Sequence, residues 1–312
     1  RLGKSNWSIL EADESDGSFI KVSPTYSIIT NIDREHMDFY KSMNNLKNLF
    51  INFIEKVPSF GKSFICIDDQ NNIQILKKIK IKNFYTYGTN VKSQFYIKKI
   101  KQFRNYSQFS VSVKLPGKKN LSINNVKIPL LGLHNIRNAT AALAVAITIG
   151  ISKNIIKQGL KEFKGVQRRF NKIFTYRNIE FYDDYAHHPT EIKELLSGVR
   201  EAYKKEEIVC IFQPHRISRL KDLREEFSLS FKKADIVILC PVYSAGEKLR
   251  LGFSYLNFAK EIMKKSNVEL YIVRDQYELA KFIKQKIYGS KVVIGMGAGS
   301  ISNWLKELPK II

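Results

Sequence analysis

The spacing of apolar residues predicts separate strands and helices in the first half of the chain. Short apolar or β-branched runs at 27–30 and 63–67 predict strands, and apolar residues at helical spacing predict a helix at 46–54. Between 84 and 128 the apolar residues alternate with polar ones in short runs that turn-forming residues separate. This pattern predicts antiparallel strands, after which an Ala-rich segment from Leu133 predicts a buried helix.

The second half of the chain alternates regularly between strand and helix patterns. Strands are predicted at 179–181, 208–212, 236–240, 268–273 and 292–296. Helices are predicted between them, at 191–204, 220–234, 255–265 and 277–287. Such alternation is typical of an α/β domain in which helices cover both faces of a mostly parallel sheet. We expect this sheet to be the smaller of the two, with a domain boundary at residue 164 and a hinge near Gly165.

Length and composition are those of a globular protein with about two domains. The chain has 312 residues, of which 44% are hydrophobic, and no run approaches the ~18 apolar residues that a membrane span needs. The three cysteines are widely spaced and form no zinc-binding pattern. This favours a reducing, cytoplasmic location. The first residue is Arg1 rather than Met, which suggests a piece of a longer chain.

The formal net charge of +23 raises the question of nucleic-acid binding. A nucleic-acid binder concentrates basic residues on one element and interleaves them with aromatic residues. Here the lysines are spread over the whole length, and only 77–82 and 98–101 are locally basic. The chain is also rich in Ile and Asn, a combination that a nucleotide bias acting on codons produces. We therefore expect no nucleic-acid partner.

The densest group of reactive side chains is the segment 182–191, Tyr-Asp-Asp-Tyr-Ala-His-His-Pro-Thr-Glu. It follows the apolar run 179–181 and precedes a predicted helix, whose first turn suits Pro189 because that position needs no N–H partner. The group therefore belongs at the carboxyl end of a strand, where ligands bind in α/β folds. The alternative is an ordinary polar loop with an Asx turn.

Two acidic segments follow strand-like runs in the first half. Glu11-Ala-Asp-Glu-Ser-Asp16 holds four carboxylates in six residues, and Asn31-Ile-Asp-Arg-Glu-His-Met-Asp38 adds a second group. Carboxylates gathered at strand ends suit a hard cation such as Mg²⁺, which takes oxygen ligands. Two such groups can converge on one metal site. The alternative is a solvated acidic loop.

Amide and arginine side chains form a further set of candidates. Asn135 and Asn138 lie three residues apart on one face of the predicted helix, where two amides can contact the donor and acceptor edge of adenine. The alternative is that Asn135 caps the helix. Arg168 and Arg169 lie in the linker between the domains, from which an arginine can reach a phosphate.

Three loops after predicted strands complete the candidates. Pro214-His-Arg-Ile-Ser-Arg219 supplies two cations, and Tyr243-Ser-Ala-Gly-Glu247 follows the next strand. Gly295-Met-Gly-Ala-Gly299 follows the last strand, where a glycine loop indicates either a nucleotide site or a tight turn.

The order of these motifs is more specific than any one of them. EADESD, TNIDREHMD, LHNIRNA, RRF, DDYAHHPTE, FQPHRISR, VYSAGE and MGAGS follow one another over essentially the whole chain. In this order they resemble the motifs of the Mur ligase family. The resemblance implies a central, ATPase-type domain with a mixed sheet (1–164) and a C-terminal Rossmann-like α/β domain (165–312).

The resemblance implies an ATP-dependent ligase that forms an amide through an acyl phosphate, in the synthesis of peptidoglycan precursors. EADESD and HMD resemble the family members that join L-alanine to UDP-N-acetylmuramate. The DD-aromatic-AHHPT element is shared with the members that recycle murein tripeptide. ATP and Mg²⁺ are the implied cofactors, and a site with a histidine ligand would also accept Mn²⁺.

The resemblance also implies roles for single residues. Glu11 and His36 match metal ligands of the family. The residues that match ATP contacts are Asn135, Asn138, Arg169 and Asp184. The residues that match the substrate-binding end are Tyr185, His187, His188, Arg216 and Arg219, of which His187, Arg216 and Arg219 are the implied catalytic residues.

Members of the family also carry an N-terminal domain that binds the UDP end of the substrate, and a phosphate-binding loop of the GTxGKT type. Neither is found here, since Gly3-Lys4-Ser5 lacks the upstream glycine and the preceding strand. We therefore expect the chain to be inactive alone unless a second chain supplies the missing domain in trans. The alternatives are a non-catalytic remnant, a ligase for murein tripeptide and a basic nucleic-acid-binding protein.

Overall fold

The computed structural model describes residues 5–80, 83–248, 250 and 252–312, so Gly3 and Lys4 of the incomplete glycine motif lie outside the described residues. The chain forms two compact units. The first comprises the chain up to Ile100 together with Phe109–Val126 and Arg137–Leu160, and the second comprises Lys101–Gln108, Lys127–Ile136 and Lys161–Ile312. Neither unit is continuous in sequence, and the boundary at residue 164 stays a prediction.

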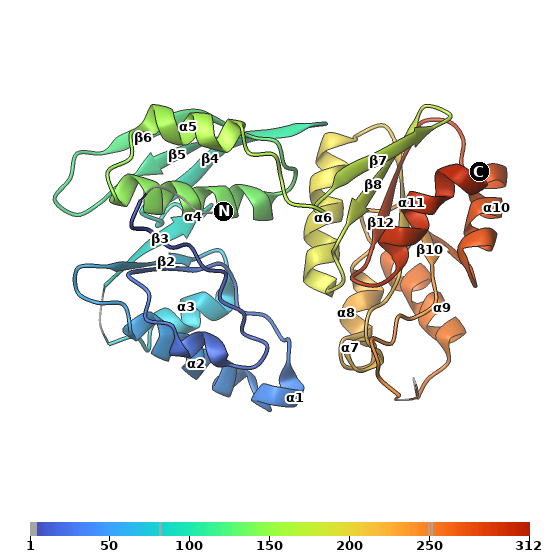
Figure 1. Cartoon of the computed structure of the whole chain (residues 1–312), viewed down its shortest axis with the longest axis horizontal. Coiled ribbons are helices and arrows are strands. Elements are labelled where there is room, and N and C mark those ends of the chain that lie inside the picture. Colours follow the sequence, from blue (N-terminus) through green and yellow to red (C-terminus); the bar gives the residue numbers. More distant parts are fainter. Residues whose placement is uncertain (1–4, 81–82, 249, 251) are drawn as a thin grey trace. The chain divides into compact units, whose positions relative to one another are not determined.

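The first six strands form one six-stranded sheet in the order β1-β2-β3-β4-β5-β6 (Figure 1). They are β1 (Tyr26–Ile29), β2 (Lys62–Cys66), β3 (Phe84–Gly88), β4 (Phe95–Phe103), β5 (Tyr106–Val113) and β6 (Leu121–Ile128). β3 pairs in parallel with both β2 and β4. The prediction of antiparallel strands throughout 84–128 was therefore wrong for β3, because period-2 alternation identifies a strand without fixing the direction of its partner.

Short helices and one long helix accompany this sheet. They are η1 (Ser18–Lys21), α1 (Met37–Tyr40), α2 (Met43–Glu55), α3 (Gln70–Leu76), α4 (Leu133–Thr148) and α5 (Lys153–Lys161). The predicted helix at 46–54 is α2, which starts where the Ser42 hydroxyl accepts the N–H of Asn45 at 3.2 Å. Phe53 of α2 is buried in one cluster with Ile29 and Ile65 of the sheet. No helix in the described part of the chain has the length and apolar character needed to cross a membrane.

The second unit holds a separate six-stranded sheet in the order β11-β10-β9-β12-β8-β7. Its strands are β7 (Asn171–Tyr176), β8 (Ile179–Asp184), β9 (Glu207–Phe212), β10 (Ile236–Leu239), β11 (Glu269–Ile272) and β12 (Lys291–Met296). All neighbours pair in parallel except β7, which is antiparallel to β8. The mostly parallel sheet is thus confirmed. It has the same number of strands as the first sheet, although its strands are shorter on the whole, and the half-buried edge strand β7 was not predicted.

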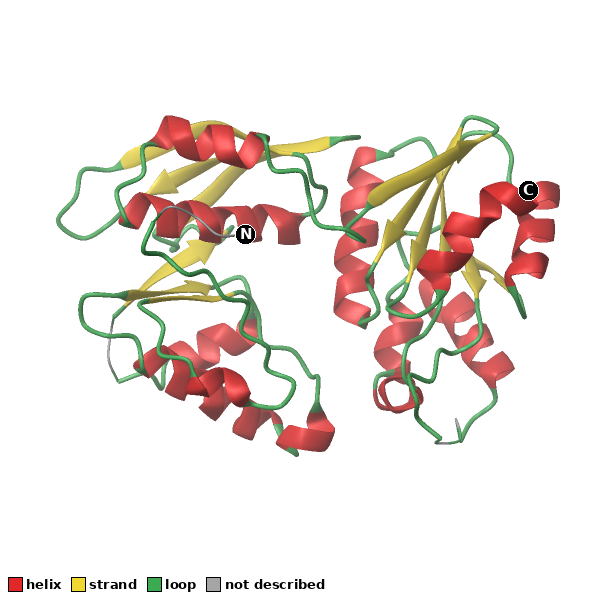
Figure 2. Cartoon of the chain, viewed as in Figure 1, coloured by secondary structure: helices red, strands yellow, loops and turns green. Residues whose placement is uncertain are grey.

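Helices cover both faces of this second sheet, as predicted (Figure 2). They are α6 (Pro189–Ala202), α7 (Ile217–Asp222), α8 (Arg224–Leu229), α9 (Tyr255–Ser266), α10 (Gln276–Lys286) and α11 (Ile301–Ile311). Cys210 and Phe212 of β9 pack in the cluster that contains α6, α8 and α9, whereas Val209 and Ile211 pack with α10 and α11. The predicted single helix at 220–234 is two helices, because the backbone leaves helical geometry at Leu223, with φ −116° and ψ 24°.

Candidate functional site

Asp183 and Asp184 end β8, and both carboxylates are buried. Oδ2 of Asp183 accepts the hydroxyl proton of Ser302 at 2.6 Å. Asp184 accepts the N–H groups of Ala186 and Phe170, each at 2.8 Å. The predicted place at the carboxyl end of a strand is confirmed, and the bond to Ala186 also forms the Asx turn that was the alternative.

The surroundings of the Asp184 carboxyl change its pKa. Burial raises the pKa of Asp184 to about 7, although the N–H donors and the charge of Arg169 favour the ionised form. At neutral pH the group can therefore donate as well as accept a hydrogen bond. Arg169 is exposed, and its Nη1 lies 3.6 Å from Oε1 of Glu191.

His188 and Glu191 cap the start of α6. The Nδ1 of His188 accepts the N–H of Thr190 at 3.3 Å, and Oε2 of Glu191 accepts the N–H groups of His187 and His188 at 3.0 and 3.2 Å. Pro189 occupies the first helical position, as predicted. The Nδ1 of His187 lies 2.9 Å from the carbonyl oxygen of Tyr185 and 3.2 Å from Glu191 Oε2. Thus His188 is buried in the cap, whereas the His187 ring is only partly buried.

Arg168 contacts Tyr185, which lies in the same turn between β8 and α6. The guanidinium of Arg168 lies over the Tyr185 ring at 4.7 Å, and its carbonyl oxygen accepts the Tyr185 N–H at 2.8 Å. Nη2 of Arg168 also donates to the carbonyl oxygen of Gly297, and Nε lies 3.6 Å from Asp183. Sequence reasoning considered this arginine only as a phosphate ligand, since nothing local reveals these contacts.

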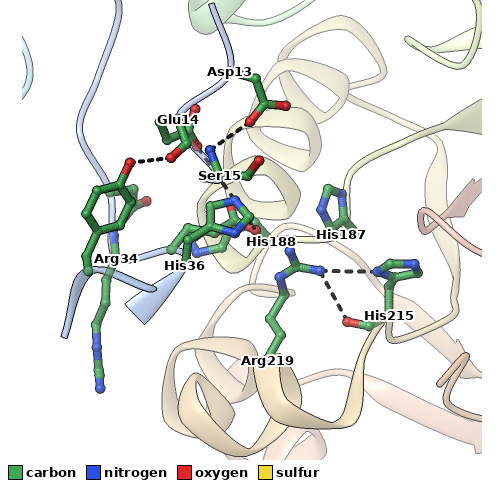
Figure 3. A network of polar contacts seen from close by, with 12 residues as sticks. Asp13, Glu14, Ser15, Arg34, His36, His187, His188, His215 and Arg219 are labelled. Carbon is green, nitrogen blue, oxygen red and sulfur yellow. Dashed lines mark hydrogen bonds and ion pairs between the residues drawn. The ribbon is translucent and has the colours of Figure 1, made fainter. Parts of the chain in front are cut away.

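His215 and Arg216 follow β9, and Arg219 lies in the next helix, α7; Figure 3 shows His215 and Arg219 next to each other. Nη1 of Arg219 donates to Nδ1 of His215 at 3.2 Å, and the rings of His215 and His187 meet edge to face at 5.7 Å. Burial, together with the charges of His187, Arg219 and Arg216, lowers the pKa of His215 to about 4. The second unit thus brings His187 and Arg219 together through His215, while the Arg216 side chain is exposed.

The glycine loop after β12 is explained by packing. A Cβ on Gly295 would lie 2.1 Å from Cδ1 of Leu305, and one on Gly299 would lie 2.6 Å from Oε1 of Gln213. Gln213 is buried, and its Oε1 accepts the N–H of Ile301, at the start of α11, at 3.0 Å. A protein side chain therefore occupies the helix N-terminus at which dinucleotide-binding folds hold a phosphate. Of the two interpretations of this loop, the structure supports the tight turn.

In the first unit, Glu14, Glu35 and His36 form a group whose ligand atoms all lie within 4.8 Å of one another. Nε2 of His36 lies 3.8 Å from Oε1 of Glu14, which Figure 3 shows facing it, and 4.0 Å from Oε1 of Glu35. Glu11 is exposed and is not part of this group. The pairing of Glu11 with His36 therefore stays a prediction, and Glu14 is a candidate that sequence reasoning did not single out.

Local hydrogen bonds shape the loop that carries Glu14. Oδ1 of Asp13 accepts the N–H of Ser15 at 2.7 Å, and Oδ1 of Asp16 accepts the N–H of Ser18 at 2.8 Å. These Asx turns use the aspartates to shape the loop. His36 itself has φ 55°, a left-handed conformation that costs energy and is found often at functional sites.

A cavity of about 210 Å³ lies beside this group. Its lining includes the acidic residues Glu14, Asp33 and Glu35 and apolar residues such as Phe19 and Phe53. A water molecule takes up about 30 Å³, so a hydrated cation fits this volume. Two carboxylates and one imidazole form a donor set that suits Mg²⁺ and also Mn²⁺.

Asn135 and Asn138 both lie on α4, as predicted. The Nδ2 of Asn135 donates to the carbonyl oxygen of Leu131 at 2.7 Å. This local bond is not an N-cap, in which the side chain accepts from a backbone N–H. The Asn138 side chain is exposed. Contact of the two amides with adenine stays a prediction.

Comparison with known protein families covers most of the chain. Residues 5–146 match the Mur ligase middle domain, and residues 168–299 match the domain described as "Mur ligase, glutamate ligase domain". The chain is 72% identical over 312 residues to a UDP-N-acetylmuramate–L-alanine ligase of Pelagibacter ubique. The match covers 100% of this chain and 67% of the relative.

More distant relatives give the same picture. A ligase of the same name from Bartonella tribocorum is 37% identical over 311 residues, covering 99% of this chain and 65% of its own length. The crystal structure of UDP-N-acetylmuramate-alanine ligase MurC from Thermotoga maritima matches with a TM-score of 0.74 at 28% identity. That match covers 96% of this chain and 62% of the other. The chain thus spans about two thirds of the length of these relatives.

Proposed function

Because the chain belongs to the Mur ligase family, we propose that it carries out ATP-dependent amide formation between UDP-N-acetylmuramate and L-alanine, in the synthesis of peptidoglycan precursors. The observation that carries this proposal is the 72% identity, along the whole chain, to a relative of that name. The substrates and the roles of single residues below are part of the proposal.

In the proposed reaction, the muramate carboxylate attacks the γ-phosphorus of ATP, and ADP leaves. The amine of L-alanine then attacks the carbonyl carbon of the acyl phosphate, and phosphate leaves from the tetrahedral intermediate with one of the former carboxylate oxygens. Both steps bring anionic groups together. Their barriers therefore fall when fixed cations and well-placed donors surround the reacting atoms.

Arg216 and Arg219 are the proposed anion-binding residues, since a guanidinium can hold a carboxylate or a phosphate through two parallel hydrogen bonds. His187 is the proposed base. Its Nδ1 faces the carbonyl oxygen of Tyr185 and the carboxylate of Glu191, which favours a proton on Nδ1 and leaves Nε2 basic. Nε2 would then accept the proton that the amine loses as it attacks.

Tyr185 and His188 are the other residues proposed for the substrate-binding site. Tyr185 would contact the substrate, and His188 would support the turn that carries His187. The ring of Tyr185 is 37% exposed and thus accessible to a ligand. His188 supports the site from within, because its buried ring caps α6 next to His187.

Further residues are proposed to contact ATP and the divalent cation. Asn135 and Asn138 would contact adenine, and Arg169 would bind a phosphate. Asp184 would contact the nucleotide, and its pKa of about 7 lets it serve a hydroxyl group as donor or acceptor. Glu14, Glu35 and His36 would hold the divalent cation, with Glu11 as a further candidate ligand. A bound Mg²⁺ neutralises charge on the phosphates of ATP.

The proposal is tested with a chimeric ligase, in which the chain is joined to the part of the Pelagibacter relative that it does not span. We expect phosphate release that requires ATP, L-alanine and UDP-N-acetylmuramate together. Arg216→Ala should lower kcat/KM by about a hundredfold or more without loss of folding, whereas Lys232→Ala, which removes one exposed charge elsewhere, should not.

Two results would contradict the proposal. Turnover with murein tripeptide in place of L-alanine would identify a recycling ligase instead. Absence of turnover with every substrate would favour a non-catalytic protein. The 312-residue chain is assayed in parallel, alone and mixed with the part of the relative that it does not span.

A cytoplasmic location is part of the same proposal. Cys66, Cys210 and Cys240 are free, buried thiols. A reducing compartment such as the cytoplasm keeps thiols in this free form.

A further inference from the structure

The loops that follow β9 and β10 in the second unit are joined to each other. The N–H of Arg216 donates to the carbonyl oxygen of Tyr243 at 2.8 Å, and the N–H of Tyr243 donates to that of Pro214 at 2.8 Å. The rings of His215 and Tyr243 stack at 5.5 Å with an angle of 11° between their planes. These bonds extend the parallel pairing of β9 and β10 beyond the ends of the strands.

Glu247 completes this junction with three hydrogen bonds. Its Oε2 accepts the N–H groups of Ile217 at 2.7 Å and Ser218 at 3.0 Å, and its Oε1 accepts the Ser218 hydroxyl at 2.6 Å. Although burial raises it, the pKa of Glu247 lies below its usual value, because the bonds from Ser218 and Ile217 stabilise the carboxylate. The ionised group is therefore the one that the loop holds.

The two N–H groups belong to the first turn of α7, where no intrahelical partner is available to them. The residue at the N-cap position is Arg216, whose side chain makes no capping bond. A carboxylate from the neighbouring loop thus takes the place of a cap. Arg216 also has φ 66° and ψ 132°, a conformation that a residue other than glycine keeps only where its surroundings hold it.

We propose that Glu247 is a positioning residue of the ligase. It holds the segment Pro214–Arg219, which includes the first turn of α7, in one conformation and so fixes the guanidinium groups of Arg216 and Arg219 where the anionic substrates bind. The role toward substrates rests on the proposed function, whereas the hold on the loop does not. Glu247 acts through the loop and needs no contact with a substrate.

The first test measures hydrogen exchange of the Ile217 and Ser218 amides in the chain and in its Glu247→Gln variant. Glutamine keeps the size of the side chain but replaces one acceptor oxygen by an NH₂ group. We expect exchange at these two amides to become about tenfold faster or more, the effect of losing a charge-assisted hydrogen bond. Glu226→Gln, an exposed change on α8, is the control and should leave both rates as they are. Unchanged exchange in Glu247→Gln would overturn the proposal.

The second test uses the chimeric ligase. Glu247→Gln should raise KM for L-alanine or UDP-N-acetylmuramate by about tenfold with a smaller effect on kcat, because the arginines remain but are no longer held in place. Ser218→Ala should have a weaker effect of the same kind, and Ser218→Thr, which keeps the hydroxyl, should behave as the parent. The double variant Ser218→Ala/Glu247→Gln should show less than the sum of the two losses, since both remove one shared contact.

Kinetic constants in Glu247→Gln equal to those of the parent would overturn the positioning role, even if the amides exchange faster. An equal loss in Glu226→Gln would overturn it as well. If the parent chimera has no ligase activity, the proposed function fails, and the exchange rates alone still decide whether Glu247 holds the loop.

Discussion

The guanidinium of Arg219 donates a hydrogen bond to Nδ1 of His215 at 3.2 Å. An arginine has donors only, so Nδ1 must carry a lone pair, and the proton of the neutral ring is on Nε2. The pKa of His215, lowered to about 4 by burial and by neighbouring positive charges, agrees with this assignment. His215 is therefore neutral and adds no charge of its own to the site, although it lies among positively charged neighbours.

We predict that His215 stays neutral down to about pH 4 and that Arg219→Ala raises its pKa toward the usual value. Between the unfolded pKa of about 6.5 and the lowered folded value, the folded chain binds fewer protons than the unfolded chain. His215 therefore makes the folded state less stable as the pH falls through this window. The imidazole signals in an NMR titration check the prediction, and titration of His215 near pH 6.5 in the unmodified chain would contradict it.

Measurements of metal affinity can decide between Glu11 and Glu14, the two candidate ligands in the first acidic segment. We predict that Glu14→Gln and His36→Ala each weaken Mn²⁺ binding by about tenfold or more, because each removes a ligand atom from the group of three. Glu11→Gln tests the family-based candidate ligand, since it removes another carboxylate of the same segment. Electron paramagnetic resonance of free Mn²⁺ gives the affinities. A loss in Glu11→Gln without a loss in Glu14→Gln would favour the family-based ligand over the observed group.

The cap of α6 should be measurable as stability. Glu191→Ala removes the acceptor for the N–H groups of His187 and His188, and we predict a loss of about 1–2 kcal/mol in the free energy of unfolding. Glu201→Ala, an exposed change near the other end of α6, is the control. Urea unfolding followed by circular dichroism compares the two. Equal stabilities would mean that Glu191 does not cap the helix.

We expect opposite effects on stability from two glycine-to-alanine changes, one in the closely packed glycine loop after β12 and one in α5. Gly299→Ala should destabilise the chain by about 1–3 kcal/mol. The reason is that its Cβ would lie 2.6 Å from both Gln213 and Tyr243. Gly159→Ala should stabilise it by up to about 1 kcal/mol, because that position in α5 has no neighbour within 4 Å. Thermal unfolding measures both. A neutral Gly299→Ala would leave the loop open to the nucleotide interpretation.

Much of the second unit could be predicted from the sequence because its strands are buried and regularly separated by helices. The start of α6 at Pro189 and the place of Asp183 and Asp184 at the end of β8 both follow from local pattern. β7 and α3 could not be predicted in the same way. β7 is a half-buried edge strand, and α3 is only seven residues long, so neither leaves a strong period in the sequence.

The contacts that set the geometry of the candidate site are the part that the sequence does not reveal. Glu247 caps a helix that begins thirty residues earlier in the chain, and Arg168 reaches Gly297 far downstream. Within EADESD, the four acids are alike as a pattern. In the structure, Asp13 and Asp16 form Asx turns with the backbone, and Glu14 is the acid that faces His36.

The proposed formation of an acyl phosphate can be tested by following oxygen from substrate to phosphate. UDP-N-acetylmuramate with oxygen-18 in its carboxylate is incubated with ATP, Mg²⁺, L-alanine and the chimeric ligase. The masses of the products are then measured by mass spectrometry. We expect an alanine amide that keeps one labelled oxygen and released phosphate that carries the other. Unlabelled phosphate, or no product that contains alanine, would contradict it.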